Sequence, residues 1–297
     1  MLMIVPEGLL PLGGSPKESP MKKHGTTILL ILVFVVGLSL LLYPTFSDWW
    51  NSMHQSRAVA SYVEQVAIID EDQYAELWES AWAFNQELTQ RENRYALTEE
   101  QITRYEQLLN VGGTGIMGYV EIPEIQVTLP VYHGTDEAVL QIAVGHLEWT
   151  SLPVGGEGSH CVISGHRGLP SAKLFTDLDK LVVGDLFMFR VLDEVLTYEV
   201  DQILIVEPHE VQDLQVIAGR DLCTLVTCTP YGINSHRLLV RGHRVENPEE
   251  AKIVRVTSDA MQIEPMIVAP IAALPMLLVL LIGILIPKRK NRRYDRW

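Results

Sequence analysis

The chain has 297 residues, of which 47% are hydrophobic and 20% are charged, and its formal net charge is −14 at pH 7. Basic residues gather at both ends, whereas residues 44–287 hold 34 acidic and 14 basic side chains. This acidic middle argues against nucleic-acid binding, because the neutralisation of phosphates needs clustered Lys and Arg. The length allows one or two domains of roughly 100 to 200 residues each.

An apolar segment lies near the N-terminus. Residues 1–25 are predicted to be a cytoplasmic N-terminus, and the Met21-Lys22-Lys23 start of the apolar run makes Met21 a candidate for the true first residue. Residues 26–43 are 18 uncharged residues, mostly Leu, Ile and Val. That length is close to the ~20 residues needed to cross a bilayer and exceeds a signal-peptide core. Because no Ala-x-Ala cleavage signal directly follows the apolar run, we expect a transmembrane anchor rather than a cleaved signal peptide.

A second apolar segment lies near the C-terminus. Residues 266–286 are 21 residues without a charge and include two prolines, which membrane helices tolerate. We expect a linker at 247–265, a transmembrane helix at 266–286 and a basic cytoplasmic tail at 287–297. The positive-inside rule places both termini in the cytoplasm and the acidic middle outside the cell membrane.

Residues 44–113 have the apolar spacing of helices, most clearly from about Ser56 to Asn110. Asp70 is expected to cap a second helix. Thr98 with Gln101 fits the capping box of a third helix. The sequence therefore predicts a helical extension before the next domain.

Residues 114–246 change to short β-rich runs separated by Gly, Pro, Asn and Asp. This pattern is typical of an antiparallel barrel or sandwich. One helical turn is expected over Asp136–Ala143 and another over Leu174–Leu181. The predicted strands are Met117–Ile122, Gln126–Val131, Ser159–Ser164, Leu186–Val191, Leu196–Val206, Cys223–Thr227 and Leu238–Val245.

Three cysteines, Cys161, Cys223 and Cys228, cannot all pair, and an odd count outside the cytoplasm indicates a free thiol. Cys228 ends a strand beside the turn at Pro230, where a side chain is accessible. Cys223 is five residues earlier and faces the other side of the strand. Two alternatives remain for Cys161 and Cys223: they form a disulfide, or they are two buried free thiols. Cys228 is the candidate nucleophile, with an inert buried cysteine as the alternative.

A nucleophilic thiol reacts as the thiolate and needs a base or a positive neighbour. His166, held between two glycines after a strand, stands out, with His133, His146 and His236 as alternatives. An arginine can donate hydrogen bonds to the oxyanion of acyl transfer. Arg237 follows Cys228 across a turn, with Arg167, Arg241 and Arg244 as alternatives. The histidines and cysteines lack zinc-like spacing, so neither a metal nor a cofactor is predicted.

Several motifs resemble a known family. Thr224-Leu-Val-Thr-Cys228 matches the Thr-Leu-x-Thr-Cys signature of sortases, and Ser164-Gly-His166-Arg-Gly with Arg237 completes the Cys, His and Arg set of that family. The resemblance is strong over residues 115–245. Further blocks resemble class C, the pilus-assembling sortases of Gram-positive bacteria: Gly118–Pro123, Leu129–Thr135, Gly145–Glu148, Leu169–Phe175 and Cys228–Asn234.

This resemblance implies a mainly β fold, a closed eight-stranded sortase β-barrel with an N-terminal helical extension and two transmembrane helices. It implies that Cys228 attacks the Thr carbonyl of an LPxTG-type (Leu-Pro-x-Thr-Gly) sorting signal, with His166 as acid and base and Arg237 at the oxyanion. A pilin lysine amine would then resolve the thioacyl enzyme. Three alternatives remain: anchoring of surface proteins to a peptidoglycan precursor such as lipid II, a tethered domain that only binds sorting signals, and a cysteine protease.

One departure concerns the lid over the site. Class C members carry an Asp-Pro-aromatic motif before the barrel, and here no proline occurs between residues 45 and 122. A lid built differently within residues 90–99 and an open site are the two alternatives.

Overall fold

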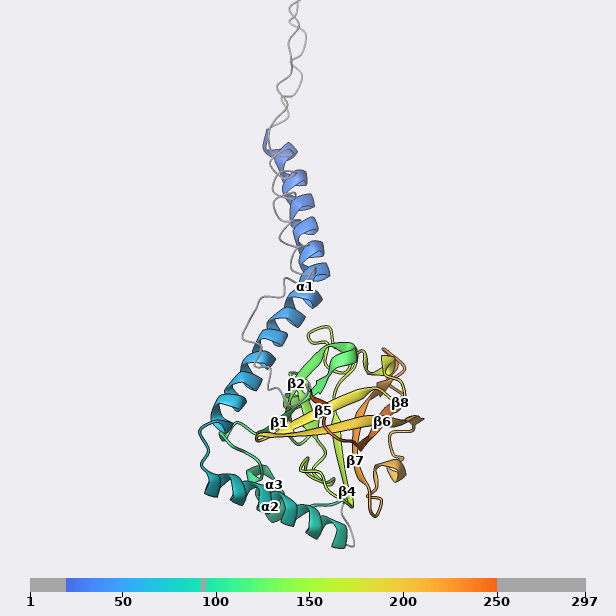
Figure 1. Cartoon of the computed structure of the whole chain (residues 1–297). Helices are drawn as coiled ribbons and strands as arrows, with labels where there is room; N and C mark the ends of the chain where they lie inside the picture. The colour runs from blue at the N-terminus through green and yellow to red at the C-terminus, as the bar shows by residue number, and fades with distance from the viewer. Residues whose placement is uncertain (1–19, 92–94, 250–297) are drawn as a thin grey trace, which may run out of the picture. The chain divides into compact units, whose positions relative to one another are not determined.

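The computed structural model describes residues 20–91 and 95–249 (Figure 1). The chain divides into two compact units, Met1–Leu42 and Tyr43–Trp297. The predicted second membrane helix at 266–286, the basic tail and most of the predicted linker lie outside the described residues.

Helix α1 runs from Pro20 to Val66 and contains Pro44. Within the described part of the chain, one helical stretch, Thr27–Val66, is long and apolar enough to cross a membrane. The sequence predicted a membrane helix at 26–43 and a new helix from about Ser56, whereas the structure keeps residues 44–55 helical. The reason is local: residues 45–55 contain no Gly or Pro, so nothing beyond Pro44 interrupts the backbone hydrogen-bond ladder.

Helices α2 (Glu71–Gln90) and α3 (Glu99–Gln107) follow, as expected. The side chain of Asp70 accepts a hydrogen bond from the Gln73 amide at 2.8 Å. Thr98 and Gln101 form a reciprocal capping box, with N···O distances of 2.9 and 3.3 Å. Both predicted helix starts are therefore confirmed.

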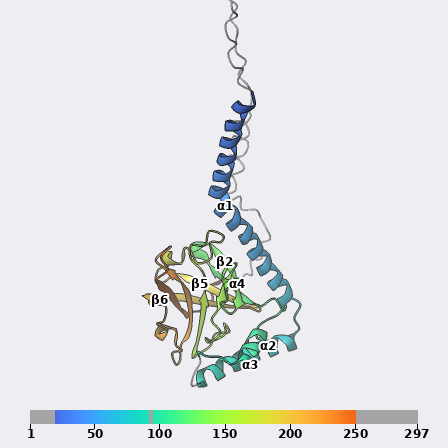
Figure 2. The same ribbon diagram turned by 180° about the vertical axis from the view of Figure 1, so that it is seen from behind.

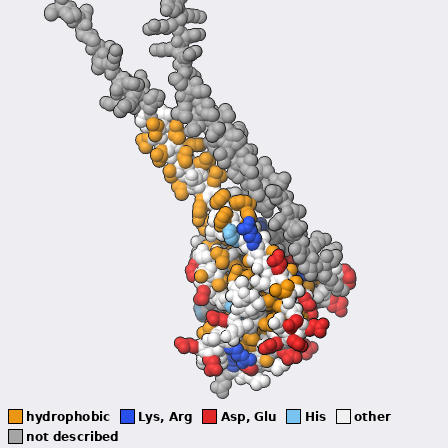
Figure 3. Space-filling model, turned by 90° about the vertical axis from the view of Figure 1, so that its left-hand side faces the viewer, with side chains coloured by type: hydrophobic (Ala, Val, Ile, Leu, Met, Phe, Trp, Pro, Cys, Tyr) orange, Lys and Arg blue, Asp and Glu red, His pale blue; other side chains and the backbone are white. Residues whose placement is uncertain are grey.

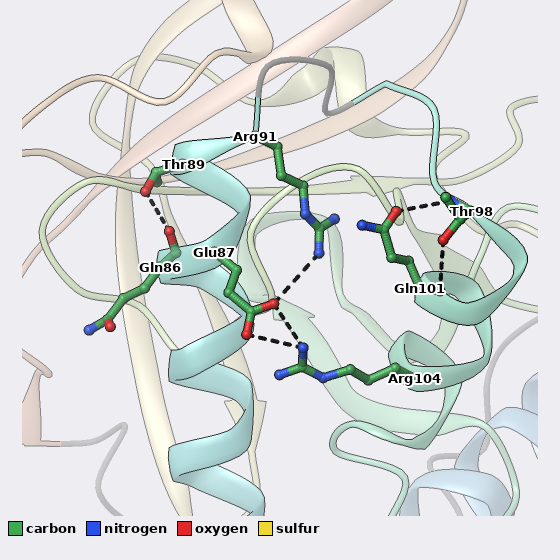
Figure 4. Close-up of polar contacts among 7 residues, drawn as sticks. All are labelled: Gln86, Glu87, Thr89, Arg91, Thr98, Gln101 and Arg104. Carbon is green, nitrogen blue, oxygen red and sulfur yellow. Dashed lines mark hydrogen bonds and ion pairs between the residues drawn. The ribbon is translucent and has the colours of Figure 1, made fainter.

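An ion pair between Glu87 and Arg104 joins the end of α2 to α3, and the C-cap residue of α2, Arg91, lies beside it (Figure 4). Glu87 accepts two hydrogen bonds from Arg104, at 3.0 and 2.8 Å, and lies 4.0 Å from a guanidinium nitrogen of Arg91. These charged contacts are half-exposed, so they fix geometry more than they add stability. The two helices lie together at one end of the barrel in opposite views (Figures 1 and 2).

The rest of the unit is a closed barrel in the order β1-β2-β3-β4-β7-β8-β6-β5, with β5 pairing back to β1. The β2/β3 and β4/β7 pairs are parallel and the other pairs are antiparallel. The strands are β1 Ile116–Ile122, β2 Val127–His133, β3 Val144–His146, β4 Ser159–Ser164, β5 Leu186–Val191, β6 Glu194–Val206, β7 Asp221–Thr229 and β8 His236–Arg244.

The barrel confirms the predicted fold class for the described residues, including seven of the eight strands. Strand β3 was not predicted, because three residues are too short to show a period of two. Short helical turns occur where expected, α4 at Glu137–Leu140 and the 3-10 turn η2 at Leu178–Lys180. Two further 3-10 turns are η1 at Pro123–Ile125 and η3 at Gln212–Leu214.

A continuous hydrophobic core fills the barrel and extends to the helices at its end. α2 contributes Ala81, Phe84 and Leu88, each at most 1% exposed. In Figure 3, Asp and Glu side chains occur over much of the visible surface of the globular part, and the described part of the apolar stretch of α1 shows mostly hydrophobic side chains. The acidic middle of the sequence is therefore largely surface charge on the barrel and its helices.

Candidate active site

Strand β7 places its cysteines on opposite sides of the barrel wall. Cys223 and Leu225 point into the core, where each is at most 1% exposed. Val226 belongs to a separate apolar cluster on the other face of the wall. Cys228 shares the parity of Val226, so it lies on the outer face, and it is half-buried. Reagents can therefore reach Cys228 but not Cys223.

The cross-strand register brings Arg237 to Cys228. The two are direct partners in the antiparallel β7/β8 pair. Residues directly opposite each other project on the same face of a sheet, so thiol and guanidinium share the outer face. Arg237 Nη1 donates to the carbonyls of Asn234 and His236, at 3.3 and 3.2 Å. These bonds hold the guanidinium near the β7/β8 turn without neutralising its charge.

His166 reaches the same place from the other side of β7. In the parallel β4/β7 pair, Ser164 is opposite Val226. The Gly165 amide extends that ladder by donating to the Val226 carbonyl at 3.0 Å. Continuing the register places His166 beside Cys228. Its side chain is 28% exposed, and its Nε2 lies 3.9 Å from a carboxylate oxygen of Glu137.

Local packing explains the glycine before His166. A Cβ on Gly165 would come within 2.7 Å of the Phe175 ring and 2.8 Å of Val144. Phe175 is fully buried, and its amide donates back to the His166 carbonyl at 3.2 Å. Glycine therefore lets the loop that begins at His166 close tightly against the barrel.

The other candidate histidines are placed differently. His146 is fully buried, and this burial lowers its pKa to about 3. His133 directs both ring nitrogens at backbone carbonyls, those of Gly115 and Leu108, and its burial lowers its pKa. His236 precedes Arg237 on β8 and therefore projects to the opposite face. Of the four, only His166 is placed beside Cys228 by the register.

The other candidate arginines are engaged elsewhere. Arg241 makes two hydrogen bonds to Asp201, at 2.9 and 3.1 Å. Arg244 donates to the Val195 carbonyl at 3.2 Å. Arg167 pairs with Asp179 and lies over the Tyr231 ring, 5.9 Å from its centroid. Arg167 thus links the loop after His166 to the turn after Cys228.

Cys161 and Cys223 are direct partners in the β4/β7 register and are free buried thiols, not a disulfide. Burial, followed by the neighbouring Cys223, raises the pKa of the Cys161 thiol well above its ordinary value. A thiol of raised pKa in the core holds little thiolate and is inert. Across residues 20–91 and 95–249, no group of three or more His, Cys, Asp or Glu residues could hold a metal ion.

Sequence reasoning did not identify two neighbours of the site. Glu137, in the first turn of α4, is the carboxylate beside His166. Tyr231, 61% exposed, supports Arg167 and the Gly168 backbone. The signal for Glu137 was its place in a short helical turn before β3, but no spacing rule connects residue 137 with residue 166.

In the connection between α2 and α3, the ring of Tyr95 lies 5.1 Å from that of Trp149.

Comparison with known proteins gives the same domain. A sortase-domain family model matches residues 120–245. Sortase D of Bacillus subtilis is 30% identical over 131 residues, which cover 43% of this chain and 63% of that protein. The chain therefore aligns with less than two thirds of this curated relative's length.

Solved structures match more completely. Sortase C1 of Streptococcus agalactiae is 49% identical, with a TM-score of 0.63, and the match covers 65% of this chain and all of that one. Streptococcus pneumoniae sortase C is 46% identical, with a TM-score of 0.59, and the match covers 64% and 97% of the two chains. With this barrel, with Cys228 opposite Arg237 on its outer face, and with these matches, the chain belongs to the sortase family of cysteine transpeptidases.

Proposed function

We propose that the protein is a membrane-anchored transpeptidase that cleaves an LPxTG-type sorting signal and joins the acyl group to a pilin lysine amine. The observation that carries the proposal is the row formed by Cys228 and Arg237 on the outer face, with the His166 loop on the other flank of β7. A half-buried thiol between an imidazole and a guanidinium has the parts that acyl transfer requires.

In the first half-reaction, the Cys228 thiolate attacks the Thr carbonyl carbon of the signal. Arg237 donates hydrogen bonds to the oxygen that becomes negative in the tetrahedral intermediate. The C–N bond then breaks, His166 gives a proton to the leaving glycine amine, and a thioester on Cys228 remains.

In the second half-reaction, a lysine ε-amine attacks the thioester carbon. His166 removes a proton from the attacking nitrogen, the C–S bond breaks, and Cys228 leaves as a thiolate. The product is an isopeptide bond, and the enzyme returns to its starting state. Water in place of the amine would give hydrolysis only.

The pilin acceptor rests on the more similar structures. The structure of the Streptococcus pneumoniae enzyme is described in terms of pilin substrate specificity, and a further sortase C1 match, 44% identical with a TM-score of 0.57, comes from a pilus island. The apolar stretch within Thr27–Val66 supports a membrane anchor, and we propose that the catalytic domain faces outside with both termini inside.

The acceptor can be tested with the full chain in detergent and an LPxTG peptide. We expect isopeptide-linked product with a lysine-bearing pilin, and little product with a lipid II amine. Preference for lipid II would assign the protein to surface-protein anchoring instead. Release of free peptide acid, even with abundant amine, would identify a protease.

A further inference from the structure

The stretch Asp48–Gln55 of α1 belongs to the same compact unit as the barrel. It forms hydrogen bonds with the loop that begins at His166 and with the turn between α4 and β3. Asp48 Oδ1 accepts a hydrogen bond from the Lys173 amide at 2.6 Å. Asn51 Nδ2 donates to the Ser171 carbonyl at 2.7 Å. Gln55 Nε2 donates to the Ile142 carbonyl at 2.7 Å. All three bonds go to main-chain atoms, so they fix backbone position.

These three residues lie on one face of α1, because positions i, i+3 and i+7 of a helix align. The same face continues to Tyr62, which is 2% exposed. Its hydroxyl donates to the Met117 carbonyl at 3.1 Å and accepts from the Leu192 amide at 2.8 Å. Tyr62 thus attaches the C-terminal part of α1 to the barrel. This contact limits the movement of the stretch Asp48–Gln55 on the same helix.

The first loop held by α1 is the one that begins at His166. Its return limb bonds to its start, through the Phe175 amide to the His166 carbonyl and the Gly168 amide to Thr176 Oγ1 at 3.1 Å. The outer part of this loop, residues 171–173, receives the bonds from Asp48 and Asn51. This part of the loop also has bonds of its own, the Leu169–Ala172 bridge and the bond from the Thr176 amide to the Lys173 carbonyl at 2.8 Å. α1 therefore adds two main-chain bonds from outside the loop.

The second loop held by α1 is the turn between α4 and β3. Ile142 lies in this turn, and α4 carries Glu137, whose carboxylate is 3.9 Å from His166 Nε2. One helix face thus bonds to the main chain of the loop that begins at His166 and to the turn that follows the helix carrying Glu137.

We propose that Asp48, Asn51 and Gln55 are positioning residues that hold His166 in line with Cys228. The inference rests on the proposed role of His166 in proton transfer. Small displacements of a proton-transfer group reduce the rate of the chemical step strongly, because the reaction needs aligned atoms. The three residues touch neither substrate nor thiol, so their effect should fall on kcat rather than on KM.

Isosteric substitutions test this without changing side-chain size. Asn51→Asp and Gln55→Glu each replace an N–H donor by an oxygen that faces a carbonyl, so both bonds become repulsive. Asp48→Asn keeps an acceptor oxygen for the Lys173 amide and serves as the conservative variant. Gln73→Glu is the control for the same kind of amide-to-carboxylate change away from the site, because Gln73 is exposed on α2.

The experiment measures kcat and KM for an LPxTG peptide with the full chain in detergent, together with hydrogen exchange of residues 166–177. For the Asn51→Asp/Gln55→Glu double variant, we expect kcat to fall about 10-fold or more, with KM within about 2-fold and faster exchange in that loop. Asp48→Asn and Gln73→Glu should behave as wild type.

Unchanged kcat and unchanged exchange in the double variant would overturn the positioning role, as would an equal loss in Gln73→Glu. A fall in kcat with exchange faster throughout the barrel, including β7, would mean general destabilisation and would also count against it. If the wild type forms no acyl enzyme, the proposed function fails, and the exchange of residues 166–177 alone decides whether α1 holds the loop.

Discussion

The two faces of strand β7 carry the same functional group in different surroundings. On the inner face, Cys223 is 1% exposed and lies opposite the buried Cys161. On the outer face, Cys228 is half-buried and lies opposite Arg237. Five residues of one strand therefore separate a thiol that fills the core from one suited to chemistry. The comparison shows that the face of the strand, more than the residue type, decides what a cysteine does here.

The largest expected effect comes from removing the thiol on the outer face of β7, compared with removing a thiol in the core. Cys228→Ala should reduce transpeptidation by about 10⁴-fold or more, because the nucleophile is lost. Cys161→Ala and Cys223→Ala should keep kcat within a few-fold of wild type in the folded protein. Rates of peptide cleavage and product formation measure this. Activity lost equally in Cys223→Ala, with the fold intact, would break the comparison.

Substitution of Arg237 tests whether Cys228 and Arg237, opposite each other on the outer face, act together. Arg237→Lys should lower kcat/KM by about 10²-fold, because a lysine keeps the charge but loses the planar fork that reaches the oxyanion. Arg241→Lys is the matched control on the same strand face, since Arg241 is committed to Asp201. Steady-state kinetics on a sorting-signal peptide separates the two variants. Equal rates for both would remove Arg237 from the mechanism.

The inner face should respond in stability instead. Leu225→Ala removes a fully buried side chain from the inner face, next to Cys223 on that face. Such truncations lower the free energy of unfolding by about 2 to 5 kcal/mol. Denaturant unfolding measures the loss, while kcat per folded molecule should stay near wild type. Ile205→Ala on β6, where the side chain is 64% exposed, is the control and should change the unfolding free energy little. A large drop in kcat without a loss of stability would contradict this division.

The last prediction concerns pH. Burial lowers the pKa of His146 to about 3 in the folded state, whereas an unfolded histidine titrates near 6.5. The unfolded chain therefore binds the proton first. The stability that the neutral ring provides is present above pH 6.5 and declines toward pH 3, by up to about 1.4 kcal/mol per pH unit.

Unfolding free energies of wild type and His146→Gln between pH 7 and pH 4 check this. The His146→Gln curve should be flatter over that range, even if the variant is less stable at pH 7. His209→Gln, at an exposed position, should keep the wild-type slope. Parallel curves for wild type and His146→Gln would show that His146 does not cause the loss of unfolding free energy at acid pH.

Local sequence signals predicted the elements that depend on nearby residues. The caps at Asp70 and Thr98 and most barrel strands follow from side chains a few positions apart. Strand β3 was missed because a three-residue strand has no measurable period. The continuity of α1 was not predicted, because the apolar run that marks the membrane helix ends at residue 43 and the next helical spacing begins near Ser56; the structure has one helix that includes Pro44.

The site was predictable only in part for the same reason. The offset between Cys228 and Arg237 could be inferred across one turn. The approach of His166, some 60 residues earlier, depends on a parallel strand pair that no local pattern reveals. Its place between two glycines made His166 a candidate, and the family resemblance selected it from the alternatives. Glu137 and the bonds of Asp48, Asn51 and Gln55 depend on tertiary packing. Such contacts join segments that are far apart in the chain and have no periodic signature.

The most direct test of the central claim is mass spectrometry of the full chain after incubation with an LPxTG peptide in the absence of an amine. We expect one added acyl mass, located on the peptide containing Cys228 and released by a lysine amine. Cys228→Ala should show no added mass. Acyl mass on Cys161 or Cys223, or none on the wild type while cleavage proceeds, would contradict the assignment of the outer-face thiol as the nucleophile.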